Sequence, residues 1–248
     1  MIKIGGESIN ARTIGSKRVV ACYIGGELIF SEPKPWYIMD SLANHYDLLN
    51  NTGNGFDPTS TVWADLVGGA DMTLHNASFG PHSLVFAGNT DAKGVHRGVD
   101  VETFTMFSTH RFPDFTGLVH PRIFGENPSP TLYARSNRGY AYAYYGQGID
   151  TDFAPQYIPP LNRIMRTAIR WRGAGHPIEL FVDGVRVGQV GPTNSYPAKA
   201  AAKYLGCNSG TTRTLAGEFF EHMVYTKPLE DAEILHNYNV SVRRYGEG

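Results

Sequence analysis

The clearest pattern of hydrophobic and polar positions lies between residues 162 and 190. From 165 to 172 a mostly apolar set of side chains alternates with an arginine-rich set: Met165, Thr167, Ile169 and Trp171 against Arg166, Ala168, Arg170 and Arg172. A period of two indicates a half-buried β-strand. After a turn segment, apolar residues alternate again on both sides of Asp183-Gly184, a dipeptide typical of a type I′ hairpin turn. Three antiparallel strands in so short a stretch predict an all-β protein.

Two further segments fit this prediction. Residues 98–112 alternate with both faces partly apolar, as expected of a central strand that is covered on both sides. Near the C-terminus, residues 233–238 predict one short helix. Its N-cap position holds Glu230, where Ser or Thr caps better, so we expect a helix without sharp ends.

The first 32 residues predict a separate small β unit. IKIGGESI and YIGGELIF are near-repeats, and each double glycine lies between apolar pairs, as in a tight hairpin. Isolated hairpins are marginally stable in water, so this unit needs a partner surface. That surface is the main domain, other copies of the unit or a larger assembly; the plainer alternative is a hairpin that seals one sandwich edge. The candidate docking or oligomerisation residues are Ile4, Ile9, Ile24, Leu28 and Phe30.

A proline-rich linker at 33–37 then leads to the main domain at 38–245, and four of its segments resemble laminin-G-like, concanavalin A-like jelly rolls. In chain order they are WADLVGGADMTLHN (63–76), SLVFAGNTD (83–91), ELFVDGVRVGQV (179–190) and AGEFFEHMVYTKPLEDAEILHNYN (216–239). The resemblance implies a two-sheet antiparallel jelly-roll sandwich with one short C-terminal helix. It also places four residues on surface turns: Asp47, Asn50, Asn51 and Asp65.

Two stretches are similar to phage and prophage proteins. HYDLLNNTGNGFDPTSTVWADL (45–66) resembles the opening of phage-encoded laminin-G-like domains, and ARTIGSKRVVACYIGGELIF (11–30) resembles short N-terminal modules of virion structural proteins. The resemblance implies a tail, baseplate or head-fibre component.

Composition excludes some function classes. A net charge of −1 gives no general attraction to nucleic acid or to an anionic membrane. No run approaches the ~18 apolar residues that span a bilayer, and no apolar signal segment opens the chain, so we expect synthesis in a cytoplasm. The two cysteines, Cys22 and Cys207, have no metal-site or redox spacing and are expected to be buried thiols.

The sequence shows no familiar catalytic pattern. Glycoside hydrolases of the concanavalin A-like fold use E-x-D-x-x-E, which places carboxylates on one strand face, and that pattern does not occur here. The nearest pairs fall short: Asp100 with Glu102, and Glu218 with Glu221. The nine histidines show no metal-binding spacing either. We therefore expect a protein that is not an enzyme and has no cofactor. Some laminin-G-like domains hold a structural Ca²⁺, for which the candidate donors are Asp65, Asp91 and Asp183.

The best candidate for ligand binding is a tyrosine-rich strand. Tyr140, Tyr142 and Tyr144 share one face of the expected strand. Aromatic faces cover the C–H patches of sugars, while hydroxyl groups bind sugar hydroxyls. The candidate carbohydrate site adds Arg135, Asn137 and Arg138. The alternatives are ordinary cross-strand packing and an oligomer contact.

These observations lead to a functional hypothesis. The chain is expected to be a non-catalytic virion protein that binds bacterial surface glycans, contacts other virion structural proteins and forms a homo-oligomer, with a trimer as our guess. The alternatives are a glycan-cleaving hydrolase of the same fold and a virion decoration protein that binds no sugar.

Overall fold

The computed structural model divides the chain into two compact units, residues 1–37 and 38–248. It describes the side chains of most residues within 36–87, 92–95, 103–113, 122–125, 158–191, 204–207 and 216–246, and of a few within 130–154. In the first unit it describes the backbone of short strands between residues 2 and 31.

The first unit consists of short antiparallel strand pairs. β1 pairs with β2, β3 with β4 and β5 with β6. The bounds are Ile2–Ile4, Glu7–Ile9, Thr13–Ile14, Lys17–Arg18, Ala21–Ile24 and Glu27–Ser31. The five candidate docking residues lie on β1, β2, β5 and β6, but their side chains are outside the described part.

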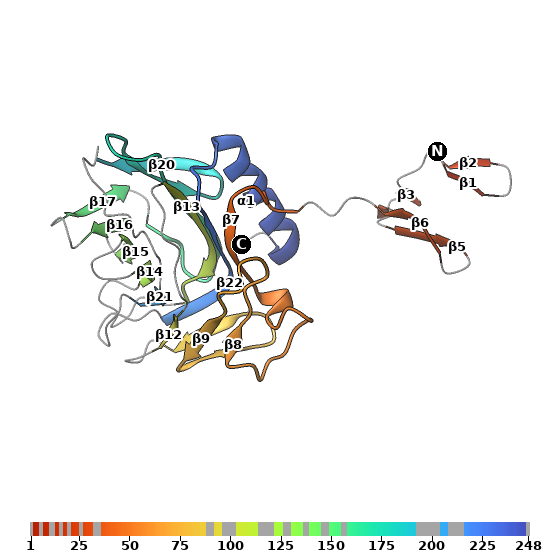
Figure 1. Ribbon diagram of the computed structural model, residues 1–248, viewed down its shortest axis with the longest axis horizontal. Helices are drawn as coiled ribbons and strands as arrows, with labels where there is room; N and C mark the ends of the chain where they lie inside the picture. Colours follow the sequence, from red (N-terminus) through yellow and green to blue (C-terminus); the bar gives the residue numbers. More distant parts are fainter. Residues whose placement is uncertain are drawn as a thin grey trace. The chain divides into compact units, whose positions relative to one another are not determined.

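The second unit is built on two eight-stranded antiparallel sheets (Figure 1). The first sheet has the order β10-β11-β22-β13-β18-β19-β20, with β7 also paired to β22. Its strands are β7 (Leu42–Asp47), β10 (Ala77–Phe79), β11 (Leu84–Ala87), β13 (Phe104–Arg111), β18 (Ile164–Trp171), β19 (Ile178–Val182), β20 (Val185–Val190) and β22 (Ala216–Tyr225).

The second sheet has the order β17-β16-β15-β14-β21-β12-β9-β8. Its strands are β8 (Val62–Trp63), β9 (Met72–His75), β12 (Lys93–Val95), β14 (Arg122–Gly125), β15 (Pro130–Arg135), β16 (Gly139–Tyr144), β17 (Ile149–Ala154) and β21 (Tyr204–Leu205). The predicted all-β, two-sheet antiparallel architecture is confirmed.

The central hairpin forms as its sequence predicts. Asp183 and Gly184, between β19 and β20, have φ angles of 49° and 79°, the positive values that a type I′ turn requires. A side chain at Gly184 would also approach Leu235 to 3.0 Å. The glycine is therefore needed both for its backbone conformation and for space.

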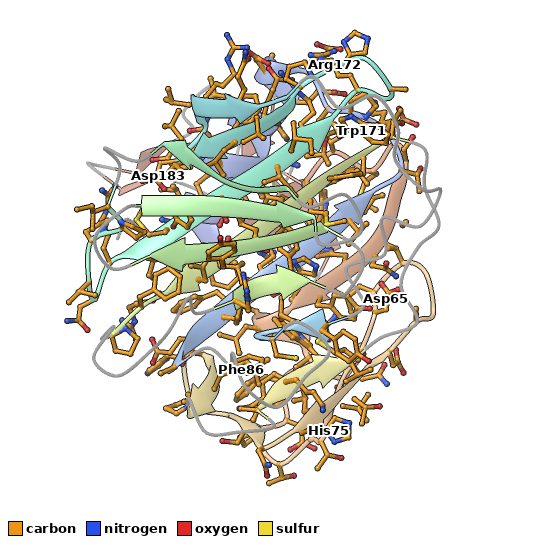
Figure 2. All side chains as sticks on the ribbon, turned by 90° about the vertical axis from the view of Figure 1, so that its left-hand side faces the viewer. Asp65, His75, Phe86, Trp171, Arg172 and Asp183 are labelled. Carbon is orange, nitrogen blue, oxygen red and sulfur yellow. The ribbon has the colours of Figure 1, made fainter. Side chains whose placement is uncertain are left out.

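The hydrophobic core fills the space between the sheets. Trp63, Phe86, Phe104 and Ile123 are each at most 1% exposed and come from both sheets. Figure 2 labels Phe86 among them. Its ring packs edge-on against Phe219 of the neighbouring strand, with 5.4 Å between ring centroids. Cys207 is a fully buried thiol, as predicted.

Helix α1 (Asp231–Tyr245) lies on the outer side of the first sheet (Figure 1). It is 15 residues long, much longer than the predicted segment. Its start is also better defined than expected, because the carboxylate of Glu233 accepts a hydrogen bond of 2.8 Å from the backbone N–H of Glu230. No helix among the described residues is long and apolar enough to cross a membrane.

Candidate functional site

A pocket of about 570 Å³ opens in the second unit, near the C-terminal end of α1. Its lining comes from the 3₁₀ turn η1 (Leu48–Asn50), the loops around residues 56 and 81, three strands of the first sheet and the end of α1. The lining residues are Leu48, Leu49, Phe56, Pro81, His82, Arg111, Ile164, Phe220, Arg244 and Tyr245. Ligand sites for small molecules have volumes of about 300–1,000 Å³, so this pocket is large enough to hold one.

Aromatic and apolar side chains make up much of the lining. Phe220 on β22 and Tyr245 at the end of α1 lie with their ring centroids 5.8 Å apart. Phe56 is 39% exposed and packs edge-on against the buried Phe79, which fixes its ring while leaving part of it accessible. The exposed Leu49 lies in the neighbouring η1 turn. These groups offer the kind of surface on which an apolar ring face packs.

An arginine–carboxylate pair supports one side of the pocket. Arg111 donates from Nε to Glu218 Oε2, and Ser83 Oγ donates to Glu218 Oε1 over 3.2 Å. Both oxygens of this carboxylate are therefore engaged. The arrangement fixes the direction of the Arg111 guanidinium, whose central carbon lies 5.7 Å from the Phe220 ring centroid.

A second pair of the same type supports another side. Arg244 donates from Nη2 to Asp47 Oδ2, and Tyr245 donates its hydroxyl to Asp47 Oδ1 over 2.7 Å. Burial raises the pKa of Tyr245 well above its ordinary value, and the negative charges of Glu221 and Asp47 raise it further. The hydroxyl therefore stays protonated at neutral pH and remains a donor to Asp47.

Asp47 corrects one sequence-based expectation. Asp47 and Asn51 were placed on surface turns, but they are only 3% and 0% exposed. Each satisfies backbone groups of the turns that it joins: Asp47 accepts from Leu49 N at 2.8 Å, and Asn51 exchanges two bonds of 2.7 Å with Asp57. The turn chemistry was predicted, whereas the burial was not.

The predicted tyrosine site is described only in part. Tyr140 lies on β16, but it is fully buried and its hydroxyl is 3.2 Å from His110 Nε2 on the facing sheet. Tyr140 is thus a core residue instead of a surface residue. The side chains of Tyr142, Tyr144 and Arg135, and the whole of Asn137 and Arg138, lie outside the described residues. Their role in carbohydrate binding stays a prediction.

Two of the three predicted calcium donors, Asp65 and Asp183, are described, and each is engaged in hydrogen bonds of its own. Asp65 accepts hydrogen bonds from His45 N and Asn44 Nδ2, at 2.9 and 2.7 Å, and from two further backbone N–H groups. Burial alone would raise its pKa, but these bonds outweigh burial and lower it. Asp183 accepts from Arg163 Nη2 and from Arg166 N. Figure 2 shows Asp65 and Asp183 in separate parts of the sandwich.

The third candidate, Asp91, lies outside the described residues. Within the described part of the chain, no group of three or more His, Cys, Asp or Glu side chains is placed to hold a metal ion.

Of the two carboxylate pairs considered for catalysis, the structure describes Glu218 and Glu221, and these two engage different partners. Asp100 and Glu102 lie outside the described residues. Glu218 supports Arg111, whereas Glu221 is fully buried under α1, where its Oε1 is 3.2 Å from His45 Nε2. Strand alternation predicted opposite faces for these two carboxylates, and that prediction is wrong. A register shift in the pairing of β22 with β13 puts Glu218 opposite Arg111 and Glu221 opposite Thr109, so both lie on the outer face of the first sheet, with different partners.

Comparison with known proteins identifies the fold. No family model matches the chain, and no curated protein matches it. Solved structures do. A sialidase from Trypanosoma rangeli has a TM-score of 0.61 and 17% identity, covering 83% of this chain and 33% of the sialidase. The botulinum neurotoxin type G receptor-binding domain has a TM-score of 0.58 and 12% identity, covering 82% of this chain and 52% of that one.

A third similar structure is domain 4 of AbnA, a GH43 extracellular arabinanase from Geobacillus stearothermophilus, in complex with arabinotriose. Its TM-score is 0.52 at 14% identity, covering 79% of this chain and 97% of that domain. At these identities the likeness establishes the β-sandwich fold alone. The chain spans about a third of the length of the sialidases that it matches.

The comparison corrects the expectation that the chain is not an enzyme. Several of the similar structures are sialidases, one in a covalent intermediate with difluorosialic acid and one a mutant with trans-sialidase activity. The absence of E-x-D-x-x-E tests only one way in which a glycosidase of this architecture can work. It was therefore a wrong basis for excluding enzymatic activity.

Sequence reasoning did not find the pocket. Phe56, Arg111, Phe220 and Tyr245 belong to segments that are far apart in the chain, and only folding brings them together. The local indication of a binding site was at the end of the predicted strand 98–112, where Arg111 precedes Phe112.

Proposed function

We propose that residues 38–248 form a glycan-binding domain whose ligand occupies the pocket lined by Phe56, Arg111, Phe220 and Tyr245. The observation that carries the proposal is the combination of aromatic rings with fixed charged donors in one pocket of about 570 Å³. Sugars present C–H faces that pack on aromatic rings and hydroxyl groups that need polar partners, and this lining offers both.

The similar structures support the same ligand class. One is described in complex with arabinotriose, one in complex with sialic acid, and one is a receptor-binding domain. Proteins that contain a domain of this fold therefore bind saccharides, although their identity to this chain is too low to transfer a site residue by residue.

We place this glycan-binding domain in a bacteriophage virion as an attachment protein for bacterial surface carbohydrate. The support is the resemblance of residues 11–30 and 45–66 to virion proteins. In this proposal the first unit joins copies of the chain, or neighbouring virion proteins, through Ile4, Ile9, Ile24, Leu28 and Phe30.

The test is a panel of bacterial surface oligosaccharides, neutral and acidic, titrated into the full chain by calorimetry. The same mixtures are assayed for new reducing ends, because cleavage is a separate property of the same protein. Binding by at least one member is expected, and Phe56→Ala should weaken it roughly two- to tenfold, the contribution of one aromatic contact.

Val185→Ala provides the matched control, since Val185 is an exposed apolar residue that does not line the pocket. Unchanged affinity in Phe56→Ala would move the binding site elsewhere. A panel in which no glycan binds would reject the function itself.

A further inference from the structure

The charged residues that line the pocket are all of one sign. Among the described lining residues, Arg111 and Arg244 are the permanent charges, and no Asp or Glu lines the pocket. The carboxylates that pair with these arginines, Glu218 and Asp47, are not part of the lining and hold the guanidinium groups from outside it. A ligand in the pocket is therefore in direct contact with positive side chains, and the negative side chains lie behind them.

Arg111 is placed to bind an anion. Its side chain is 34% exposed, and within the described part of the chain its guanidinium donates one hydrogen bond, from Nε to Glu218. The two Nη groups remain available as a planar fork. A guanidinium fork matches the two oxygens of a carboxylate or sulfate with parallel hydrogen bonds, which an ammonium cannot do.

The surroundings of Arg111 hold that fork in place. The Phe220 ring lies beneath the guanidinium, and Ser83 fixes the carboxylate of Glu218 to which Nε is bonded. Little side-chain freedom is then lost when an anion binds, so more of the interaction energy contributes to affinity. Glu218 and Ser83 act here as positioning residues.

We infer that the pocket selects acidic glycans, and that Arg111 recognises a carboxylate or sulfate group on the sugar ring while the exposed face of Phe56 packs against the ring. This inference rests on the proposed function and specifies its ligand class. Carboxylate and sulfate are both compact, negatively charged groups with several oxygen atoms, and a guanidinium can bind either one.

The experiment compares ligands that differ only in charge, with the full chain. Trigalacturonate is titrated against its methyl ester, and a sulfated galactan oligosaccharide against its desulfated counterpart, at low and high salt. The acidic member of at least one pair should bind roughly ten- to a hundredfold tighter, the range expected for hydrogen bonds to a charged group. Preference within the first pair identifies carboxylate as the source, and preference within the second identifies sulfate.

Three variants assign the preference to Arg111. Arg111→Met should reduce the affinity for the acid by about tenfold or more and leave the neutral partner nearly unchanged. Arg111→Lys should retain only part of the preference, since it keeps the charge but not the fork. Glu218→Gln keeps the shape of its side chain but weakens the support of Arg111, so we expect an intermediate loss.

Arg243→Met is the control, because Arg243 is an exposed arginine of α1 that does not line the pocket, and its loss changes net charge equally. Thermal unfolding checks that each variant is folded; if Arg111→Met is not, Arg111→Lys and Glu218→Gln carry the test. Equal affinity for the acidic and neutral members of both pairs, or an equal loss in Arg243→Met, would overturn the inference. If neutral glycans of the panel bind and no acidic one does, the selectivity is wrong but the proposed function stands.

Discussion

The central strands of the first sheet, β13, β18 and β19, are buried on both faces, but by different chemistry. The inner face of the sheet, toward the second sheet, presents Met106, Ile169 and Leu180, all fully buried among other apolar groups. Its outer face, toward α1, presents Arg166 and Arg170, each only 2% exposed. One strand, β18, contributes to both faces.

The inner face is stabilised by apolar area and ring packing. Phe104 and Trp171, on paired strands, have ring centroids 6.1 Å apart. The polar groups here are few, such as the contact of 2.8 Å between Ser108 Oγ and His222 Nδ1. Burial of this kind is non-directional, so it determines which face is inside more strictly than which residues touch.

The outer face is held by directional contacts. Arg170 donates from Nε to Glu179 Oε2 at 2.7 Å and from Nη1 to the carbonyl of Leu229 at 2.7 Å, and it is paired with Asp231 at the start of α1. Burial would raise the pKa of Glu179, but hydrogen bonds from Arg170 and Arg186 outweigh burial and lower it. Directional contacts fix where the helix lies along the sheet, which apolar packing alone would leave less determined.

The largest expected effect comes from breaking the outer face at Arg170. Arg170→Ala leaves the nearly buried Glu179 without its closest partner and should reduce the free energy of unfolding by about 3–5 kcal/mol. Urea unfolding followed by tryptophan fluorescence measures the loss. The double variant Arg170→Met with Glu179→Leu removes both charges and should recover most of it. If the double variant is no more stable than Arg170→Ala, the outer face does not depend on charge pairing.

The inner face should respond to the loss of volume instead. Leu180→Ala removes fully buried methyl groups from β19 and should cost about 3 kcal/mol. Leu180→Met conserves volume and should cost less than about 1.5 kcal/mol. Equal losses in the two variants, measured by the same urea titration, would show that close packing does not govern this face.

This contrast explains how far the sequence predicts the fold. The alternation from Met165 to Arg172 predicted the strand and its inner face correctly, because apolar residues at a period of two have one stable arrangement. The same pattern suggests that Arg166 and Arg170 face water. They are buried because distant residues supply their partners, and no local pattern encodes such pairs.

The candidate site was less predictable for a related reason. The tyrosines from 140 to 144 share a strand face by sequence, but alternation does not say whether that face is inside or outside, and Tyr140 is in the core. The pocket depends on Phe56, Arg111 and Tyr245, which approach one another only through the paired strands and the helix. Short-range sequence patterns do not show that residues so far apart in the chain come together in the fold.

Acidification should lower the free energy of unfolding by about 2 kcal/mol through His110, a buried residue of the inner face. Burial of His110 lowers its pKa from 6.5 to about 3, and the charge of Arg166 contributes in the same direction. Between these two pKa values His110 is protonated in the unfolded chain and neutral in the folded chain. The contribution of neutral His110 to the free energy of unfolding is therefore fully present above about pH 6.5 and is lost as pH falls toward 3. By about pH 5 the loss from this group is roughly 2 kcal/mol.

His110→Gln isolates this contribution, because the other titrating groups are common to both proteins. Unfolding free energies of the two proteins, measured from pH 7 to pH 5, should diverge in slope, with the variant less sensitive to acid. Parallel curves would mean that His110 is protonated in the folded protein, against the burial that the structure gives it.

The smallest effect should come from one hydroxyl group of the outer face. Ser241 Oγ on α1 lies 2.8 Å from Thr109 Oγ1 and accepts from Arg166 Nε at 3.2 Å. Ser241→Ala leaves Arg166 Nε without that acceptor and Thr109 Oγ1 without its partner, which costs about 1–3 kcal/mol. Alanine is the better helix former by up to about 0.7 kcal/mol. We expect a net loss of about 1 kcal/mol. Asn239→Ala, at an exposed position of the same helix, should show only the gain in helix propensity. If Ser241→Ala stabilises the protein as Asn239→Ala does, then α1 is placed by its apolar residues, and the outer face differs from the inner one in composition but not in mechanism.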